Sequence, residues 1–130
     1  MAWMKDVYKK PKYGNRRTTH PDGSRFASAL ECAVYCVLLM RERCGELKDI
    51  KKQHRVDMIH RKRPRSWKVD FSATVVATGK TLWIEAKGSE SNKYLVDLKA
   101  WEKDGPGDLE IWKGSWQRPY LKEVRKGGRK

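Results

Sequence analysis

Residues 67–88, WKVDFSATVVATGKTLWIEAKG, contain two runs in which apolar and polar side chains alternate with a period of two. Such alternation is typical of β-strands with one buried face. The Thr-Gly pair at residues 78–79 suits a tight turn, because glycine readily takes a positive φ. We therefore predict a hairpin. With a two-residue turn, Asp70 faces Lys87 and lies diagonal to Glu85, so two acids and a lysine meet on its polar face.

This convergence of charged side chains has two interpretations. Neighbouring carboxylates repel each other unless a cation lies between them. Magnesium takes oxygen ligands from one or two carboxylates, keeps several waters, and assists phosphoryl displacement. Lys87 could then hold the attacking water or the charge that develops on the phosphate. The other interpretation is a cross-strand ion pair on a solvated sheet face, worth less than about 1 kcal/mol. The hairpin alone favours neither.

The overall charge favours a functional interpretation. The chain of 130 residues suffices for one domain. It carries 30 Lys and Arg against 16 Asp and Glu, a net charge of +14. This excess indicates a polyanionic partner, most simply nucleic acid. There is no apolar run of membrane-spanning length and no signal-peptide segment. Three cysteines, an odd number without zinc-ligand spacing, indicate buried reduced thiols and a cytoplasmic location.

Basic residues gather in three segments. Residues 1–23 are predicted to form an extended arm, residues 60–68 a loop interrupted by Pro64, and residues 114–130 a partly ordered tail. The arm and the loop are candidate phosphate contacts, and solvated segments are the alternative. Gln53, within a polar stretch before the loop, could orient a water or a phosphate. The candidate nucleic-acid-binding residues are Lys12, Arg16, Arg17, Gln53, Arg61, Lys62, Arg63 and Arg65.

Residues 25–44 are predicted to form a helix, because apolar residues recur there every three or four positions and Gly45 provides a stop. Glu31 lies at the edge of the apolar stripe. It could approach the end of the sheet as a catalytic acid. It could also complete a capping box with Ser28 at the start of the helix. The two roles require different directions of the side chain.

The remaining elements complete an α/β pattern. Residues 47–59 carry two short strand-like runs, and a strand from this region is expected to pair with the hairpin. His54 and His60 lack an evident nucleophile partner, so Ser/His catalysis has little support. A second helix is expected from Ser91 to Gly105, followed by a short strand at residues 109–112 that lies parallel to the hairpin.

The order and spacing of these features resemble the PD-(D/E)XK nuclease superfamily. In particular, they are similar to small phage-encoded endonucleases of the endonuclease I type, which resolve Holliday junctions. The similar motifs are Lys12-Tyr13-Gly14-Asn15, Asp22-Gly23, Arg25-Phe26, Leu30-Glu31, Val69-Asp70-Phe71 and Glu85-Ala86-Lys87-Gly88. The resemblance covers roughly residues 12–112. Val69 stands where the family name expects proline.

The resemblance implies a restriction-endonuclease-like core over residues 24–113, with a mixed sheet of about four strands flanked by helices. It implies that Asp70 and Glu85 hold Mg²⁺, with Mn²⁺ as a substitute, helped by a carbonyl near Ala86. Lys87 would position or activate water, and Glu31 would be an outer or second-metal acid. The implied reaction is hydrolysis of a DNA phosphodiester, leaving a 5′-phosphate and a 3′-hydroxyl.

The substrate and the oligomeric state follow only by analogy. Branched DNA cut twice would require two active sites and hence a homodimer. Three alternatives stay open at this point. They are a nicking or sequence-tolerant nuclease, a non-catalytic nucleic-acid-binding protein, and an assembly protein that coats nucleic acid.

Overall fold

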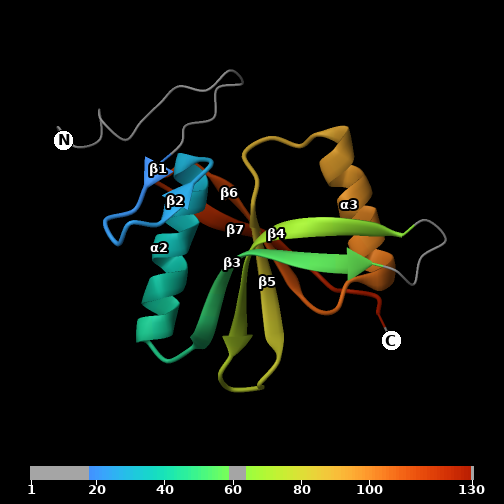
Figure 1. The fold of residues 1–130 in the computed structure, drawn as a ribbon, viewed down its shortest axis with the longest axis horizontal. Coiled ribbons are helices and arrows are strands. Elements are labelled where there is room, and N and C mark those ends of the chain that lie inside the picture. Colours follow the sequence, from blue (N-terminus) through green and yellow to red (C-terminus); the bar gives the residue numbers. More distant parts are fainter. Residues whose placement is uncertain (1–17, 59–63, 130) are drawn as a thin grey trace.

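The structure, a computed structural model, describes residues 18–58 and 64–129. A five-stranded mixed sheet carries one helix on each face, and a small two-stranded sheet precedes it (Figure 1). The fold is therefore α/β. Its elements are β1 (Thr18–Thr19), β2 (Arg25–Phe26), α2 (Ala29–Arg43), β3 (Leu47–Met58), β4 (Arg65–Val75), β5 (Thr81–Ala86), α3 (Asn92–Asp104), β6 (Leu109–Gly114) and β7 (Pro119–Arg125).

The main sheet has the order β3-β4-β5-β6-β7. All neighbours are antiparallel except β5 and β6, which are parallel and are connected through α3. This arrangement confirms the predicted strand before the hairpin and the predicted parallel strand after the second helix. The region expected to be a tail from residue 114 instead contributes β7, which pairs with β6 along its length. The sheet thus has five strands rather than about four.

The predicted hairpin is present, but its register was wrong by two residues. Phe71 pairs with Ile84 and Thr74 with Thr81. The turn is longer than predicted, because the N–H of Val75 donates to the carbonyl of Lys80 at 2.8 Å. Gly79 does take a positive φ, +73°. A shift of two residues does not in itself move a side chain to the other face, since strands repeat with a period of two.

The hydrogen bonds at the ends of the helices follow the sequence signals. The hydroxyl of Ser28 accepts the N–H of Glu31 at 3.1 Å, and that of Ser91 accepts the N–H of Tyr94 at 3.2 Å. Such caps satisfy N–H groups that have no partner within the helix. Not every apolar residue of the helices is buried, since Met40 on α2 and Leu95 on α3 are exposed.

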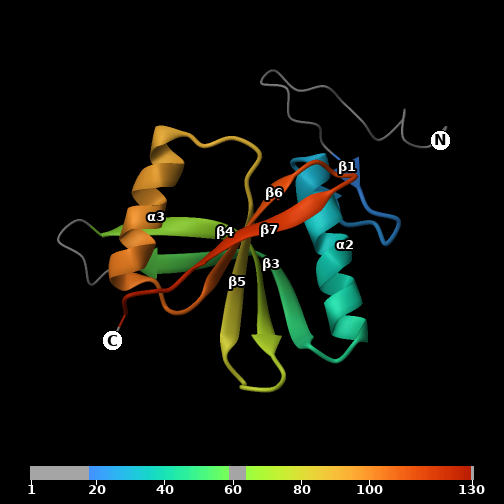
Figure 2. The same ribbon diagram turned by 180° about the vertical axis from the view of Figure 1, so that it is seen from behind.

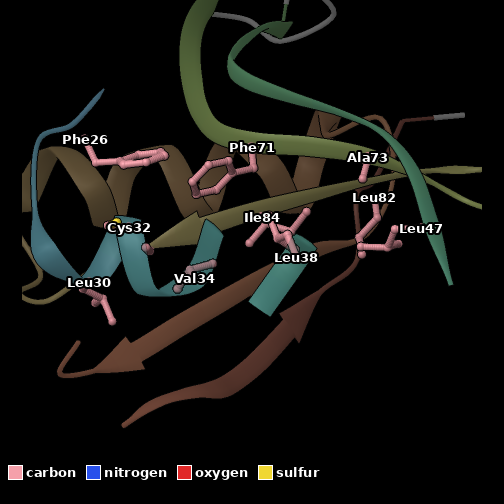
Figure 3. Packing of buried hydrophobic residues seen from close by; sticks show 11 residues of the cluster. Phe26, Leu30, Cys32, Val34, Leu38, Leu47, Phe71, Ala73, Leu82 and Ile84 are labelled. Atoms are coloured by element: carbon pink, nitrogen blue, oxygen red, sulfur yellow. The ribbon is translucent and has the colours of Figure 1, made fainter. Parts of the chain in front are cut away.

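Two hydrophobic cores lie on opposite faces of the sheet. Alternate residues of β5 separate them, because Leu82 and Ile84 pack in the core beneath α2, whereas Trp83 packs in the core beneath α3. Figure 3 shows the α2 core, in which Phe26 and Phe71 lie above the helix. The α3 core is rich in tryptophan, with perpendicular contacts between Trp101 and its neighbours. The sheet is therefore covered on both faces, as is usual for a sheet with parallel pairing.

The β3–β4 hairpin bends sharply near its middle. In Figures 1 and 2, one half of it lies in the sheet and the other half runs towards α3. Trp67 and Val69 accordingly pack in the α3 core, while Phe71 and Ala73 pack in the α2 core. Regular alternation would place all four on one face. The reversal occurs at Asp70, so the bend puts this predicted site residue at a corner.

The chain before α2 is more regular than an extended arm. Thr18 pairs with Phe26 in the small sheet. Asp22 stabilises the connecting turn by accepting the N–H of Ser24 at 2.8 Å and the hydroxyl of Tyr35 at 2.8 Å. These hydrogen bonds lower the pKa of Asp22 well below its usual range. Residues 18–23 are therefore not part of an extended arm, and the rest of the predicted arm lies outside the described residues.

Two further expectations can be compared with the structure. The cysteines are free thiols, but only Cys32 is buried, whereas Cys36 is partly buried and Cys44 is exposed. Desolvation raises the pKa of Cys32 to about 12.

Among the described helices, none combines the length and the apolar character needed to cross a membrane.

Candidate active site

Asp70 and Glu85 lie side by side on β4 and β5. The backbone N–H of Asp70 donates to Oε1 of Glu85 at 3.1 Å, and the backbone N–H of Ala86 donates to Oδ2 of Asp70 at 2.9 Å. Phe71 pairs with Ile84, so the same register continued by one residue places Asp70 opposite Glu85. The structure thus brings together the two acids expected from the sequence. It differs from the prediction in that Asp70 faces Glu85 rather than Lys87.

Burial of this pair disfavours its charged form. Glu85 is only 5% exposed. Desolvation and the charge of Asp70 raise the pKa of Glu85 well above its ordinary value. Desolvation also raises the pKa of Asp70, against hydrogen bonds from its neighbours and the attraction of Lys87. Such shifts in adjacent carboxylates are typical of functional sites.

Glu31 joins the same cluster from α2. Desolvation and the charge of Asp70 raise the pKa of Glu31 to about 7, while a backbone hydrogen bond from Ala27 and the charge of Lys87 lower it. Its backbone N–H donates to the Ser28 hydroxyl, which is one half of the predicted capping box. The hydrogen bond from the Ser28 N–H to the Glu31 carboxylate, which would complete the box, is not among those of the described residues. The carboxylate instead interacts electrostatically with Asp70, so its direction is that of the acidic cluster.

Lys87 provides the nearby positive charge. It follows β5 directly, and its charge acts on Asp70, Glu85 and Glu31. It forms no ion pair with any described acid within 4.0 Å. Its ammonium instead lies 5.5 Å from the centroid of the Tyr94 ring, within range of a cation–π contact. Lys87 is thus close to the acids without being bound to one of them.

Gln53 lies at the same corner on the neighbouring strand. Its side chain hydrogen-bonds Asp70, which lowers the pKa of that acid. Gln53 has a φ of +52°, a left-handed conformation that is uncommon outside glycine. Backbone strain of this kind concentrates at functional sites. Here it accompanies the bend that places Asp70 at the corner.

A cavity of about 550 Å³ opens beside the two acids. Its walls come from β3, β4, the end of β5 and the first turn of α3. The lining residues are Arg55, Ser66, Trp67, Lys68, Asp70, Glu85, Lys87, Ser91, Lys93, Tyr94 and Asp97. Several of these residues were not singled out from the sequence. Lys68 could have been, since it alternates with Asp70, whereas Lys93 and Tyr94 carry no signal beyond their place after a helix cap.

The predicted nucleic-acid contacts are only partly described. Lys12, Arg16, Arg17, Arg61, Lys62 and Arg63 lie outside the described residues. Arg65 is described, and it ion-pairs with the buried Asp97 of α3 at 2.6 Å. Its charge is thus already compensated within the fold. Arg65 thus links β4 to α3, and its predicted contact with a phosphate stays a prediction.

His54 has a partner that the sequence did not reveal. Its Nδ1 lies 2.6 Å from Oγ of Ser72 on β4. The two residues are not directly opposite each other, since His54 pairs with Val69. Ser72 is 2% exposed, so this hydroxyl is not accessible as a nucleophile. The contact links the strands beside Gln53 and adds no second catalytic centre.

The donor atoms at the cluster fit a hard divalent cation. Carboxylates from Asp70, Glu85 and Glu31 supply only oxygen. Within the described part of the chain, no three His, Cys, Asp or Glu side chains are already arranged to hold a metal. Magnesium does not require such a cage, because it keeps several waters and uses one or two carboxylates. A divalent cation would also favour the charged forms that burial disfavours.

Comparisons of this chain with protein-family models, curated proteins and solved structures gave no significant match.

Proposed function

We propose that this protein is a magnesium-dependent DNA endonuclease. One observation carries the proposal: Glu85, a buried acid, lies beside Asp70, whose negative charge helps to raise its pKa, and it forms no ion pair within 4.0 Å with a basic residue that the structure describes. Such an arrangement costs stability unless a cation is bound. The excess of positive charge over the whole chain adds an affinity for a polyanion.

In this proposal Asp70 and Glu85 hold the metal, with the Ala86 carbonyl and Glu31 as further oxygen donors. Bound magnesium would make a water more acidic and stabilise charge on the phosphate. Lys87, which is not bound to any described acid, positions the attacking water. That water attacks phosphorus in line, and the 3′ oxygen leaves. The products are a 5′-phosphate and a 3′-hydroxyl.

The finer features rest on the sequence resemblance. We propose a restriction-endonuclease-like core, action on branched DNA as a homodimer, and a cytoplasmic location. A protein that binds nucleic acid without cutting it would share the positive charge. It would not need buried acids held next to each other, so the carboxylate cluster favours the enzyme.

Cleavage assays test the proposal. Supercoiled plasmid and a four-way junction, each with linear duplex as a comparison, are incubated with magnesium or with EDTA. We expect cutting that needs the metal and falls by about a thousandfold or more in Asp70→Asn and Lys87→Ala, a size typical of essential groups. Lys80→Ala, at the exposed hairpin turn, is the matched control and should cut normally.

Binding measurements complete the assay. Asp70→Asn should bind DNA at least as tightly as the natural protein, because a negative charge is removed. Binding by every variant without cutting in magnesium or manganese would overturn the enzyme in favour of the non-catalytic protein. Preference for the junction over the linear duplex would support branched DNA as the substrate.

A further inference from the structure

The cavity beside the acids extends well beyond them. In Figure 1, the segment that leaves β5 arches over to the start of α3, above the first half of β4. The cavity lies among these elements, and its lining includes Lys68 on β4 and Lys93 on α3. Both lysines are exposed. The lining thus combines the acids with lysines that come from other elements.

The charges around the cavity are unequally compensated. Arg55 pairs with Asp57 at 2.8 Å, and Asp97 is neutralised by Arg65. Lys68 and Lys93 make no ion pair with a residue that the structure describes. Two lysines of the cavity lining are therefore not paired with an acid that the structure describes. This arrangement suits an anionic ligand.

The start of α3 adds to the positive potential. The positive end of the helix dipole faces the cavity through Ser91 and Lys93. Tyr94, which also lines the cavity, is 3% exposed, and its hydroxyl is buried without a hydrogen-bond partner. An unpaired buried hydroxyl costs about 1–3 kcal/mol. A ligand oxygen would supply the missing partner.

We propose that this cavity binds a backbone phosphate of a nucleic-acid strand, next to the phosphate that the acids would attack. Lys68 and Lys93 neutralise it, and the Tyr94 hydroxyl donates a hydrogen bond to it. The position of this phosphate beside the attacked one rests on the proposed function, whereas binding itself needs no catalysis. These contacts involve the phosphate and no base, so they position the strand without recognising its sequence.

Binding of a fluorescein-labelled oligonucleotide in EDTA tests the site by anisotropy at several salt concentrations. The variant Lys68→Ala/Lys93→Ala is compared with Lys99→Ala/Lys103→Ala, which removes two exposed lysines from the later turns of α3. We expect the first variant to bind about tenfold more weakly or worse. Its slope of log affinity against log salt should fall by about two, because two phosphate-neutralising charges are lost. Equal affinities and slopes for the two variants would overturn the site.

Tyr94→Phe tests the hydroxyl separately. Removal of an unpaired buried group should leave the free energy of unfolding unchanged or raise it. If the hydroxyl contacts phosphate, affinity should fall about threefold to tenfold, as expected for one lost hydrogen bond. Higher stability with unchanged affinity would exclude the hydroxyl from the site. Inorganic phosphate at matched ionic strength is added as a competitor, and displacement at low millimolar concentration would identify a small phosphate as the ligand instead.

Failure of this inference and failure of the nuclease proposal look different. If the lysine pair matters for binding but no variant cuts DNA, the cavity is supported and the enzyme is overturned. If the lysine variant binds and cuts like its control, the cavity is overturned and the enzyme is supported. If the lysine variant binds DNA more weakly but cuts normally at saturating DNA, both the phosphate cavity and the nuclease proposal are supported.

Discussion

The buried acids of the described residues have two kinds of surroundings. Three of them face arginines: Glu110 lies 2.9 Å from Arg41, Asp97 lies 2.6 Å from Arg65, and Asp104 lies 3.3 Å from Arg129. Glu85 is buried to the same degree. It hydrogen-bonds the backbone of Asp70 and interacts with the Asp70 carboxylate, and no described cation lies within 4.0 Å of it.

The difference separates acids that hold the fold together from acids that serve a ligand. An arginine opposite a buried acid compensates the cost of its desolvation. It joins elements that are distant in sequence, as Arg41 joins α2 to β6. Glu85 forms no such ion pair with a described residue, and its pKa is raised. A buried acid without a basic partner is therefore the better marker of a functional site.

The largest expected effect distinguishes Glu85 from Glu110. Glu85→Gln should reduce cleavage by about a thousandfold or more, and it should not lower stability in EDTA, because it removes a disfavoured charge. Glu110→Gln should lower the free energy of unfolding by about 2 kcal/mol, because Arg41 loses its buried partner and keeps only the more exposed Glu46. Cleavage rates per folded molecule and urea titrations measure the two effects. A destabilised Glu85→Gln protein would contradict the comparison.

Loss of the partner arginine should produce the next largest effect. Arg65→Ala leaves Asp97 buried without compensation and should cost about 3 kcal/mol. The change is read from the urea midpoint at constant slope. Arg65→Ala/Asp97→Asn serves as the control, since removal of both charges should recover much of the loss. An Arg65→Ala protein as stable as the natural one would show that this pair does not hold β4 to α3.

Glu31 should make stability depend on pH in the opposite sense from a salt-bridged acid. Its pKa is raised to about 7 from an ordinary 4.5. The folded state therefore retains a proton that the unfolded state releases, and stability in EDTA falls as pH rises from about 4.5 to 7. Glu31→Gln should remove the part of this fall that comes from Glu31, while Asp70 and Glu85, whose pKa values are also raised, keep their own contributions. The variant should be about 2 kcal/mol more stable than the natural protein at pH 8. Denaturation at pH 5, 6, 7 and 8 checks it, and parallel curves for both proteins would refute it.

The smallest expected effect is stabilisation by magnesium. A cation at tenfold its dissociation constant should raise the free energy of unfolding by about 1.4 kcal/mol, since it binds only the folded state. Thermal unfolding with MgCl₂ or an equal ionic strength of NaCl measures it. Asp70→Asn should lose the response, and Asp97→Asn should keep it. An equal response in both variants would place the cation elsewhere.

Much of the fold was predictable because its signals are local. Alternation identified the hairpin, and Ser91 and Gly105 bounded α3 as predicted. The register could not be derived, because the turn was assumed to contain two residues and the structure closes it between Val75 and Lys80. Strand β7 was missed because it buries neither face. Tyr120, Leu121 and their neighbours therefore show no alternation of apolar and polar residues.

The candidate site was predictable in its acids but not in its setting. Asp70 and Glu85 were expected on one polar face, and the two-residue error in register preserved that face. At the bend, Gln53 takes a left-handed backbone conformation although it is not glycine. No sequence pattern indicates such a conformation. The role of Arg65 depends on Asp97, which lies 32 residues away. The cavity arises from packing of α3 against β4, so its lysines were not foreseeable as a pair.

The corner at Asp70 makes this acid sensitive to chain length. The sheet half of the hairpin is anchored by α2 and the outer half by α3, and the two halves meet at this residue. Insertion of one residue between Val69 and Asp70 would reverse the facing of one anchored half. Changes of length at residues 76–79 would leave both halves in place. We therefore expect natural variants of this chain to carry longer connections at the tips of the hairpins. We expect no variant with even one codon added at the corner.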